Sequence, residues 1–137
     1  MIAYQQALAR AVAHGGGAVP GVRDPDVGRF AEMALRKRLA ALQDLLPLTF
    51  AALGRPAFEE RYRAFARARA PVGPEQYRDE AIAFARSLGT ATARREARIA
   101  AAHGPQRSFA IVRDGRRVTI FARLRRGARL RVVQLFW

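Results

Sequence analysis

The spacing of apolar residues changes once along this chain, at Gly104-Pro105, and this change limits the folds that the chain can adopt. Before it, apolar side chains recur every three or four residues, which is typical of amphipathic helices. After it, β-branched and aromatic residues alternate with arginines and are interrupted by two turn sequences, which predicts short strands. We therefore expect an α+β fold with a helical body over residues 1–104 and a sheet module over residues 105–137.

Glycine and proline divide the helical part into five to six expected helices. Asp24-Pro25 supplies a helix start, because proline is favoured in the first helical turn, and Gly54 and Gly89 supply helix ends. Aromatic residues recur at helical spacing, and core packing alone explains that spacing. The expected helices cover residues 2–13, 24–46, 47–53, 56–70, 74–88 and 92–102.

Two turn sequences set the expected strand pairing in the sheet module. Asp114-Gly115 is a favoured two-residue hairpin turn, and it would place Ile111 opposite Val118. The sequence 125–127, Arg-Arg-Gly, fits a three-residue loop with glycine in the left-handed position, which would place Ile120 opposite Val132. Together they predict a three-stranded antiparallel β-meander.

The two predicted registers separate the side chains onto two faces of the sheet. One face is expected to hold most of the aliphatic residues, and the opposite face mixes arginines with apolar side chains. Such a mixture suits a contact surface, although the apolar members could instead pack on the helix 92–102 or on a second copy of the chain. Strands 108–113 and 129–137 would be open edges. The predicted contact residues are Arg117, Phe121, Arg123, Arg129, Arg131, Val133, Leu135 and Trp137.

Positive charge is concentrated in the last third of the chain. The formal net charge is +14, and residues 94–137 carry 12 basic and 2 acidic side chains, so they account for +10 of it. A surface of this kind favours an acidic partner, such as an acidic peptide, an acidic protein or a nucleic acid.

The sequence offers few groups that could catalyse a reaction. It has no cysteine, which excludes disulfides and thiolate chemistry, and its two histidines, His14 and His103, stand beside glycines at expected helix ends. Its adjacent acidic pairs point in different directions on helices, so they do not form a facing acid–base dyad. We expect a non-catalytic protein without metal or cofactor. A cytoplasmic location is expected, since no apolar stretch is long enough to span a membrane.

The segment from Leu46 to Leu88 resembles the N-terminal domain of the BufC/HvfC family. The matching features are Pro47 after a leucine-rich helix, Leu53-Gly54, Phe58, Phe65, Pro71 and the helix that carries Phe84. The C-terminal part is similar in plan to methanobactin-type partner proteins, in which a small antiparallel sheet follows a helical body. Proteins of these kinds accompany multinuclear non-haem iron oxidative enzymes in the biosynthesis of ribosomal peptides.

The resemblance implies a non-catalytic partner subunit that binds the leader segment of a precursor peptide and presents it to the iron enzyme. The leader would join the sheet as an added strand, and the arginines would suit a leader rich in Asp and Glu. Two alternatives stay open on the sequence: a basic nucleic-acid-binding protein of winged-helix-like plan, and an adaptor that dimerises through its sheet edge.

Overall fold

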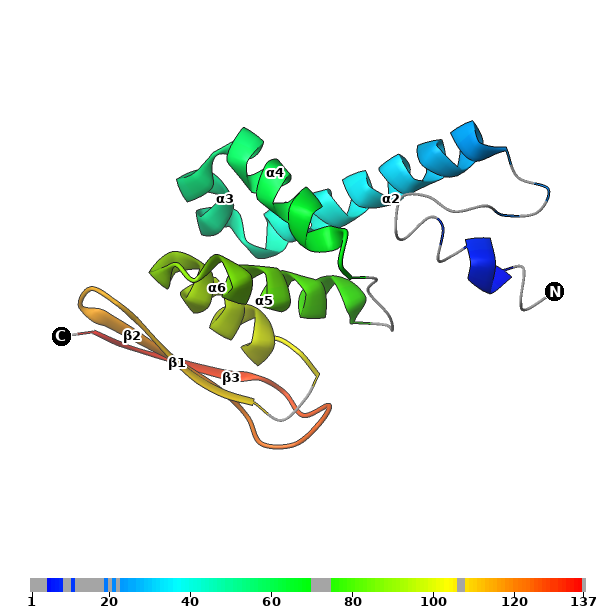
Figure 1. The fold of residues 1–137 in the computed structure, drawn as a ribbon. Coiled ribbons are helices and arrows are strands. Elements are labelled where there is room, and N and C mark those ends of the chain that lie inside the picture. Colours follow the sequence, from blue (N-terminus) through cyan, green and yellow to red (C-terminus); the bar gives the residue numbers. More distant parts are fainter. Residues whose placement is uncertain are drawn as a thin grey trace.

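The computed structural model describes residues 5–8, 11, 19, 21, 23–69, 75–105 and 108–136. Helices precede a three-stranded antiparallel sheet of order β1-β2-β3, so the predicted α+β fold is confirmed (Figure 1). The predicted helix 2–13 and Trp137 lie largely or wholly outside the described residues. The elements are α2 (Asp24–Leu45), α3 (Pro47–Leu53), α4 (Arg55–Ala66), α5 (Gln76–Leu88), α6 (Ala91–Ala102), β1 (Ser108–Asp114), β2 (Arg117–Arg123) and β3 (Arg131–Phe136).

Aromatic side chains from α4 and α5 form the centre of the helical body. Phe58, Tyr62 and Phe84 are fully buried, and the Phe84 ring meets the other two edge to face at centroid distances of 5.3 and 5.4 Å. Such edge-to-face pairs add to the free energy gained by burying the rings. The expectation that these aromatic residues are core residues is confirmed.

A buried ion pair joins α2 to α5 beside this aromatic core. The Arg38 guanidinium donates two hydrogen bonds to the Glu80 carboxylate, and the one from Nε measures 3.1 Å. The guanidinium also lies 5.7 Å from the centre of the Tyr62 ring. Burial, and after it the Glu80 charge, raises the pKa of Tyr62 above its usual value. Tyr62 therefore stays a neutral phenol within the core.

Glu96 ties α6 to the start of α3. Its buried carboxylate accepts hydrogen bonds from the backbone N–H groups of Leu48 (2.7 Å) and Thr49 (2.8 Å), in the first turn of α3. The α3 helix has no side-chain cap of its own, because Leu46 stands at the capping position. A carboxylate from a distant helix therefore satisfies donors that a local Ser or Asp usually satisfies.

The sheet packs on α6 through one of its faces. Val112 of β1 and Phe121 of β2 are buried against Ala102, with Ile99, Ala110 and Leu130 around them. Alanines lie on both sides of α6, so the other helices and the sheet can both pack close to its backbone. Ala93 and Ala97 belong to the core of the helical body, and Ala102 contacts the sheet. Figure 1 shows α5 alongside α6, α3 and α4 above them, and the sheet below.

The first hairpin differs from its prediction by two residues. The structure pairs Asp114 with Arg117 and Ile111 with Ile120, so the two-residue turn is Gly115-Arg116 instead of Asp114-Gly115. Gly115 has φ +57°, and no other described residue type takes a positive φ, so Asp114 avoids the left-handed conformation that the predicted turn needs. A shift of two residues keeps every side chain on its predicted face.

The second connection differs by one residue, and this shift exchanges the faces of β3. Ile120 lies opposite Val133 rather than Val132, because the segment between β2 and β3 is longer than a three-residue loop. The Gly127 N–H donates to the Pro105 carbonyl (3.0 Å), and Arg123 Nη1 donates to the Ala128 carbonyl (2.5 Å). These bonds hold the loop against the end of α6 and set the register of β3.

Replacing Glu96 with alanine should destabilise the fold, because two N–H groups at the start of α3 lose their acceptor. We expect a loss of about 1–3 kcal/mol in the free energy of unfolding, measured by urea denaturation. Glu96→Gln, whose amide oxygen can still accept, should lose less. Glu60→Ala, an exposed change on α4, is the matched control and should stay within about 0.5 kcal/mol of the wild type. Equal stability of Glu96→Ala and Glu60→Ala would contradict the capping role.

Paired cysteines test the register of β3 directly, since the chain has none of its own. Ile120→Cys with Val133→Cys places two thiols opposite each other on one face, where cross-strand distances permit a disulfide. Ile120→Cys with Val132→Cys, the pair that the turn sequence predicted, points the thiols to opposite faces. Oxidation should cross-link the first pair only, as measured by intact mass and the loss of free thiol. Preferential cross-linking of the second pair would contradict the register of the structure and support the register predicted from the turn sequence.

Candidate functional site

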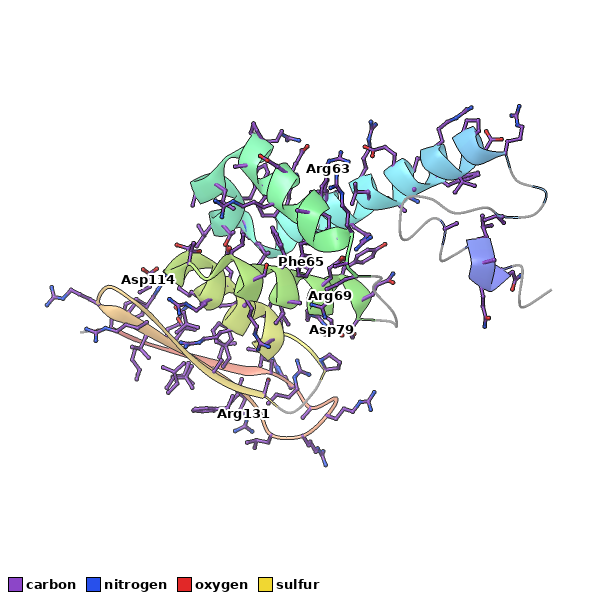
Figure 2. All side chains as sticks on the ribbon, viewed as in Figure 1. Arg63, Phe65, Arg69, Asp79, Asp114 and Arg131 are labelled. Carbon is purple, nitrogen blue, oxygen red and sulfur yellow. The ribbon has the colours of Figure 1, made fainter. Side chains whose placement is uncertain are left out.

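The eight predicted contact residues do not form one surface. Arg117, Phe121 and Arg123 lie on the face of the sheet turned toward α6, whereas Arg131, Val133 and Leu135 lie on the opposite face. Figure 2 shows Arg131 on the side of the sheet away from the helices. Arg129 lies in the loop before β3 and is exposed. The single mixed face predicted from the sequence is therefore wrong, because β3 is shifted by one residue.

Three of these residues have structural partners. Phe121 is buried and its ring lies 5.6 Å from the His103 ring, so it is a core residue between α6 and the sheet. Arg117 pairs with Asp114 at 3.4 Å. Arg123 holds the loop before β3 through the Ala128 carbonyl. Their predicted position on an open outer surface is corrected, since the sheet turns this face toward α6.

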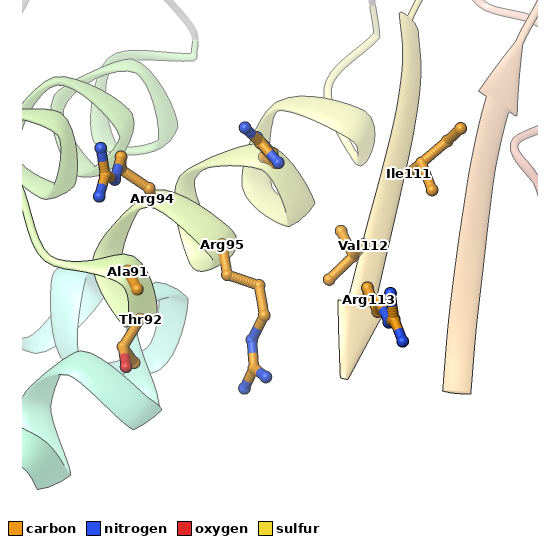
Figure 3. Close-up of a pocket in the computed structure, with 8 residues that line it drawn as sticks. Ala91, Thr92, Arg94, Arg95, Ile111, Val112 and Arg113 are labelled. Atoms are coloured by element: carbon orange, nitrogen blue, oxygen red, sulfur yellow. The ribbon is translucent and has the colours of Figure 1, made fainter. Parts of the chain in front are cut away.

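The structure instead places arginines beside the open edge of β1. A groove of about 500 Å³ runs between the first turns of α6 and this strand (Figure 3). Ile111, Val112 and Arg113 follow one another along its wall, so the groove borders the strand's backbone as well as its side chains. Because β1 is paired only with β2, its other edge has no strand beside it in the described sheet. The helix side supplies Ala91, Thr92, Arg94, Arg95 and Arg98.

The arginines on the helix side differ in their partners. Arg95 forms an ion pair with Asp114 (3.1 Å), which fixes the hairpin end of β1 to α6; Figure 2 shows Asp114 at that end. Arg94 and Arg98 are exposed, and neither has an ion-pair partner among the described residues. Residues four apart lie on the same side of a helix, so both guanidinium groups can serve one ligand. The groove thus combines a strand edge with two available cations.

Acidic groups near the groove are already engaged. Asp114 is shared by Arg95 and Arg117, and Glu96 caps α3 on the far side of α6. From residue 115 to 137 the sequence contains no Asp or Glu. The positive potential around the sheet is therefore not neutralised by nearby carboxylates, and the groove favours an anionic ligand.

The groove residues on α6 were not part of the predicted site. Their spacing on one helix side was visible in the sequence, but the pattern did not indicate that this side would lie along β1. That arrangement depends on the packing of Val112 against Ala102. Packing of helix 92–102 on the sheet was one of the alternatives that the sequence left open, and adopting it would have been the signal needed to include Arg94 and Arg98.

Other kinds of site find no support in the described part of the chain. No group of three or more His, Asp or Glu side chains there could hold a metal ion. None of its helices is long and apolar enough to cross a membrane. Comparison with known protein families, curated proteins and solved structures finds no match for this chain.

Proposed function

We propose that this protein is a non-catalytic partner subunit that binds the acidic leader segment of a ribosomal precursor peptide. The leader is held for a multinuclear non-haem iron oxidative enzyme. The observation that carries the proposal is the open edge of β1 beside an arginine-lined groove. The resemblance of residues 46–88 to partner proteins of such enzymes supports it.

The peptide adds to β1 as a fourth strand. Backbone N–H and C=O groups along an open edge bind an extended peptide irrespective of its sequence, which provides affinity. Side chains on alternate positions then face either α6 or the other side of the sheet. Those facing α6 meet Arg94 and Arg98, so acidic residues at every second position are selected. The edge thus supplies affinity, and the arginines supply the preference for an acidic leader.

The β1 edge fits this role better than the β3 edge. Beside β1, helix α6 forms a second wall that an added strand contacts along its length. All six residues of β3 are exposed, whereas α6 packs on Val112 of β1 and Phe121 of β2. A peptide on β3 would therefore gain hydrogen bonds but no enclosing wall, and it would meet no arginine on a neighbouring helix.

Reversing the two groove charges should weaken peptide binding. We expect Arg94→Glu with Arg98→Glu to reduce affinity for a labelled acidic leader peptide by roughly tenfold or more, measured by fluorescence anisotropy. The probe is a synthetic extended peptide of about ten residues with Asp or Glu at every second position. Arg61→Glu with Arg67→Glu on and just after α4 is the matched control, since it changes net charge equally and leaves the groove intact.

Hydrogen exchange shows whether the peptide binds the β1 edge or the β3 edge of the sheet, and competition with DNA tests the nucleic-acid alternative. Bound peptide should slow amide exchange in β1 and leave β3 unchanged. Protection confined to β3, or no binding with the iron enzyme present, would contradict the proposal. A nucleic-acid-binding role predicts instead that arbitrary duplex DNA competes with the peptide at moderate salt, with an affinity that falls steeply as salt rises.

A further inference from the structure

The face of the sheet turned away from α6 is apolar across all three strands. The pairing arranges its nine positions in three rows of three, one residue from each strand, with arginines at two opposite corners. The other seven positions are apolar, and four of these residues are β-branched. The rows are Phe109, Ala122 and Arg131; Ile111, Ile120 and Val133; and Arg113, Val118 and Leu135.

No element of the described chain covers this face. Phe109 is 70% exposed, and Ile111, Val133 and Leu135 are each about half exposed. The helices all lie on the other side of the sheet (Figure 1). A sheet in a protein of this size usually buries one face and presents polar residues on the other. Here the second face carries the composition of a core layer, which indicates that another molecule completes the packing.

Charge argues against a second copy as that molecule. A twofold dimer through this face would bring the same surface against itself, including Arg113 and Arg131. The face holds no carboxylate, and the bordering loops add Arg116, Arg125, Arg126 and Arg129. Two such surfaces would bury apolar groups while repelling each other electrostatically. A partner with acidic groups around an apolar patch removes this repulsion.

The size of the face indicates how the partner must bind. Three strands about 4.8 Å apart and about five residues long cover roughly 250 Å². A stable protein–protein interface takes about 800 Å² from each partner. The apolar rows can therefore form the centre of an interface, and the bordering arginines must supply much of its rim.

We propose that the outer face of the sheet is a docking surface for a protein with an apolar patch bordered by Asp and Glu. The seven apolar side chains form the buried centre of this interface, and Arg131 and the arginines of the adjacent loops pair with the acidic border. The surface shares Ile111 and Arg113 with the β1 wall of the groove, but its other members lie on β2, on β3 and at the start of β1. Binding at Val133 and Leu135 of β3 therefore does not depend on the proposed peptide binding.

A photo-cross-linking residue at position 133 tests the proposal in cells that express the gene natively. Benzoylphenylalanine replaces Val133 in one strain and Met33, an equally exposed apolar residue on α2, in the control. Cross-linked products are identified by mass spectrometry, and the identified protein is purified and titrated against the full chain. We expect one acidic protein cross-linked through position 133 and not through position 33.

The titration then compares variants. Val133→Ser with Leu135→Ser, both exposed on β3 and outside the groove, should weaken binding of the purified protein at least tenfold, and added salt should weaken it further. Met33→Ser and the groove variant Arg94→Glu with Arg98→Glu should bind like the wild type, which separates this inference from the peptide proposal. The inference is overturned by a cross-link to a second copy, to nucleic acid or to nothing. If the wild type sediments with anionic lipid vesicles and Val133→Ser with Leu135→Ser does not, the inference is overturned in favour of a membrane surface.

Discussion

The contact of Val112 and Phe121 with Ala102 determines which face of the sheet is buried, and the rest of the surface follows from it. Because this contact turns one face toward α6, the arginines of that helix lie along β1, and the aliphatic rows face outward. The position of α6 is in turn held by Glu96, which joins it to α3. Helix α6, through its alanines and the buried Glu96 carboxylate, thus connects the helical core to both candidate binding surfaces, the β1–α6 groove and the outer face of the sheet.

The sequence predicted the elements of the fold well, because glycine, proline and apolar spacing act locally. The meander and its approximate strands were also predicted correctly. The register of β3 was not, since the loop before it is held by a hydrogen bond from the Gly127 N–H to the distant Pro105 carbonyl and by one from the Arg123 side chain to the Ala128 carbonyl. A local turn rule cannot include an acceptor from the end of a helix, and one residue of error exchanges the two faces.

The sequence predicted the kind of candidate site, arginines beside an open strand edge, but not the residues that form it. An arginine-rich sheet with open edges was expected, and arginines do line the open edge of β1. The particular residues differ, because Arg117 and Arg123 are engaged within the fold, while Arg94 and Arg98 come from a helix that the sequence did not place beside the sheet. Tertiary packing, rather than composition, selects which of the many arginines have no internal partner.

The absence of Asp and Glu after residue 114 also has a kinetic consequence. A field of one sign around the sheet attracts an acidic molecule from beyond contact distance and turns it toward the arginines before the surfaces meet. Salt shortens the range of that field to about 10 Å or less near 0.1 M, and so acts chiefly on the rate of encounter. The lifetime of a complex, once formed, depends instead on how well the apolar groups fit. Recognition by this protein is therefore divided between a fast, charge-guided approach and a slower release set by packing.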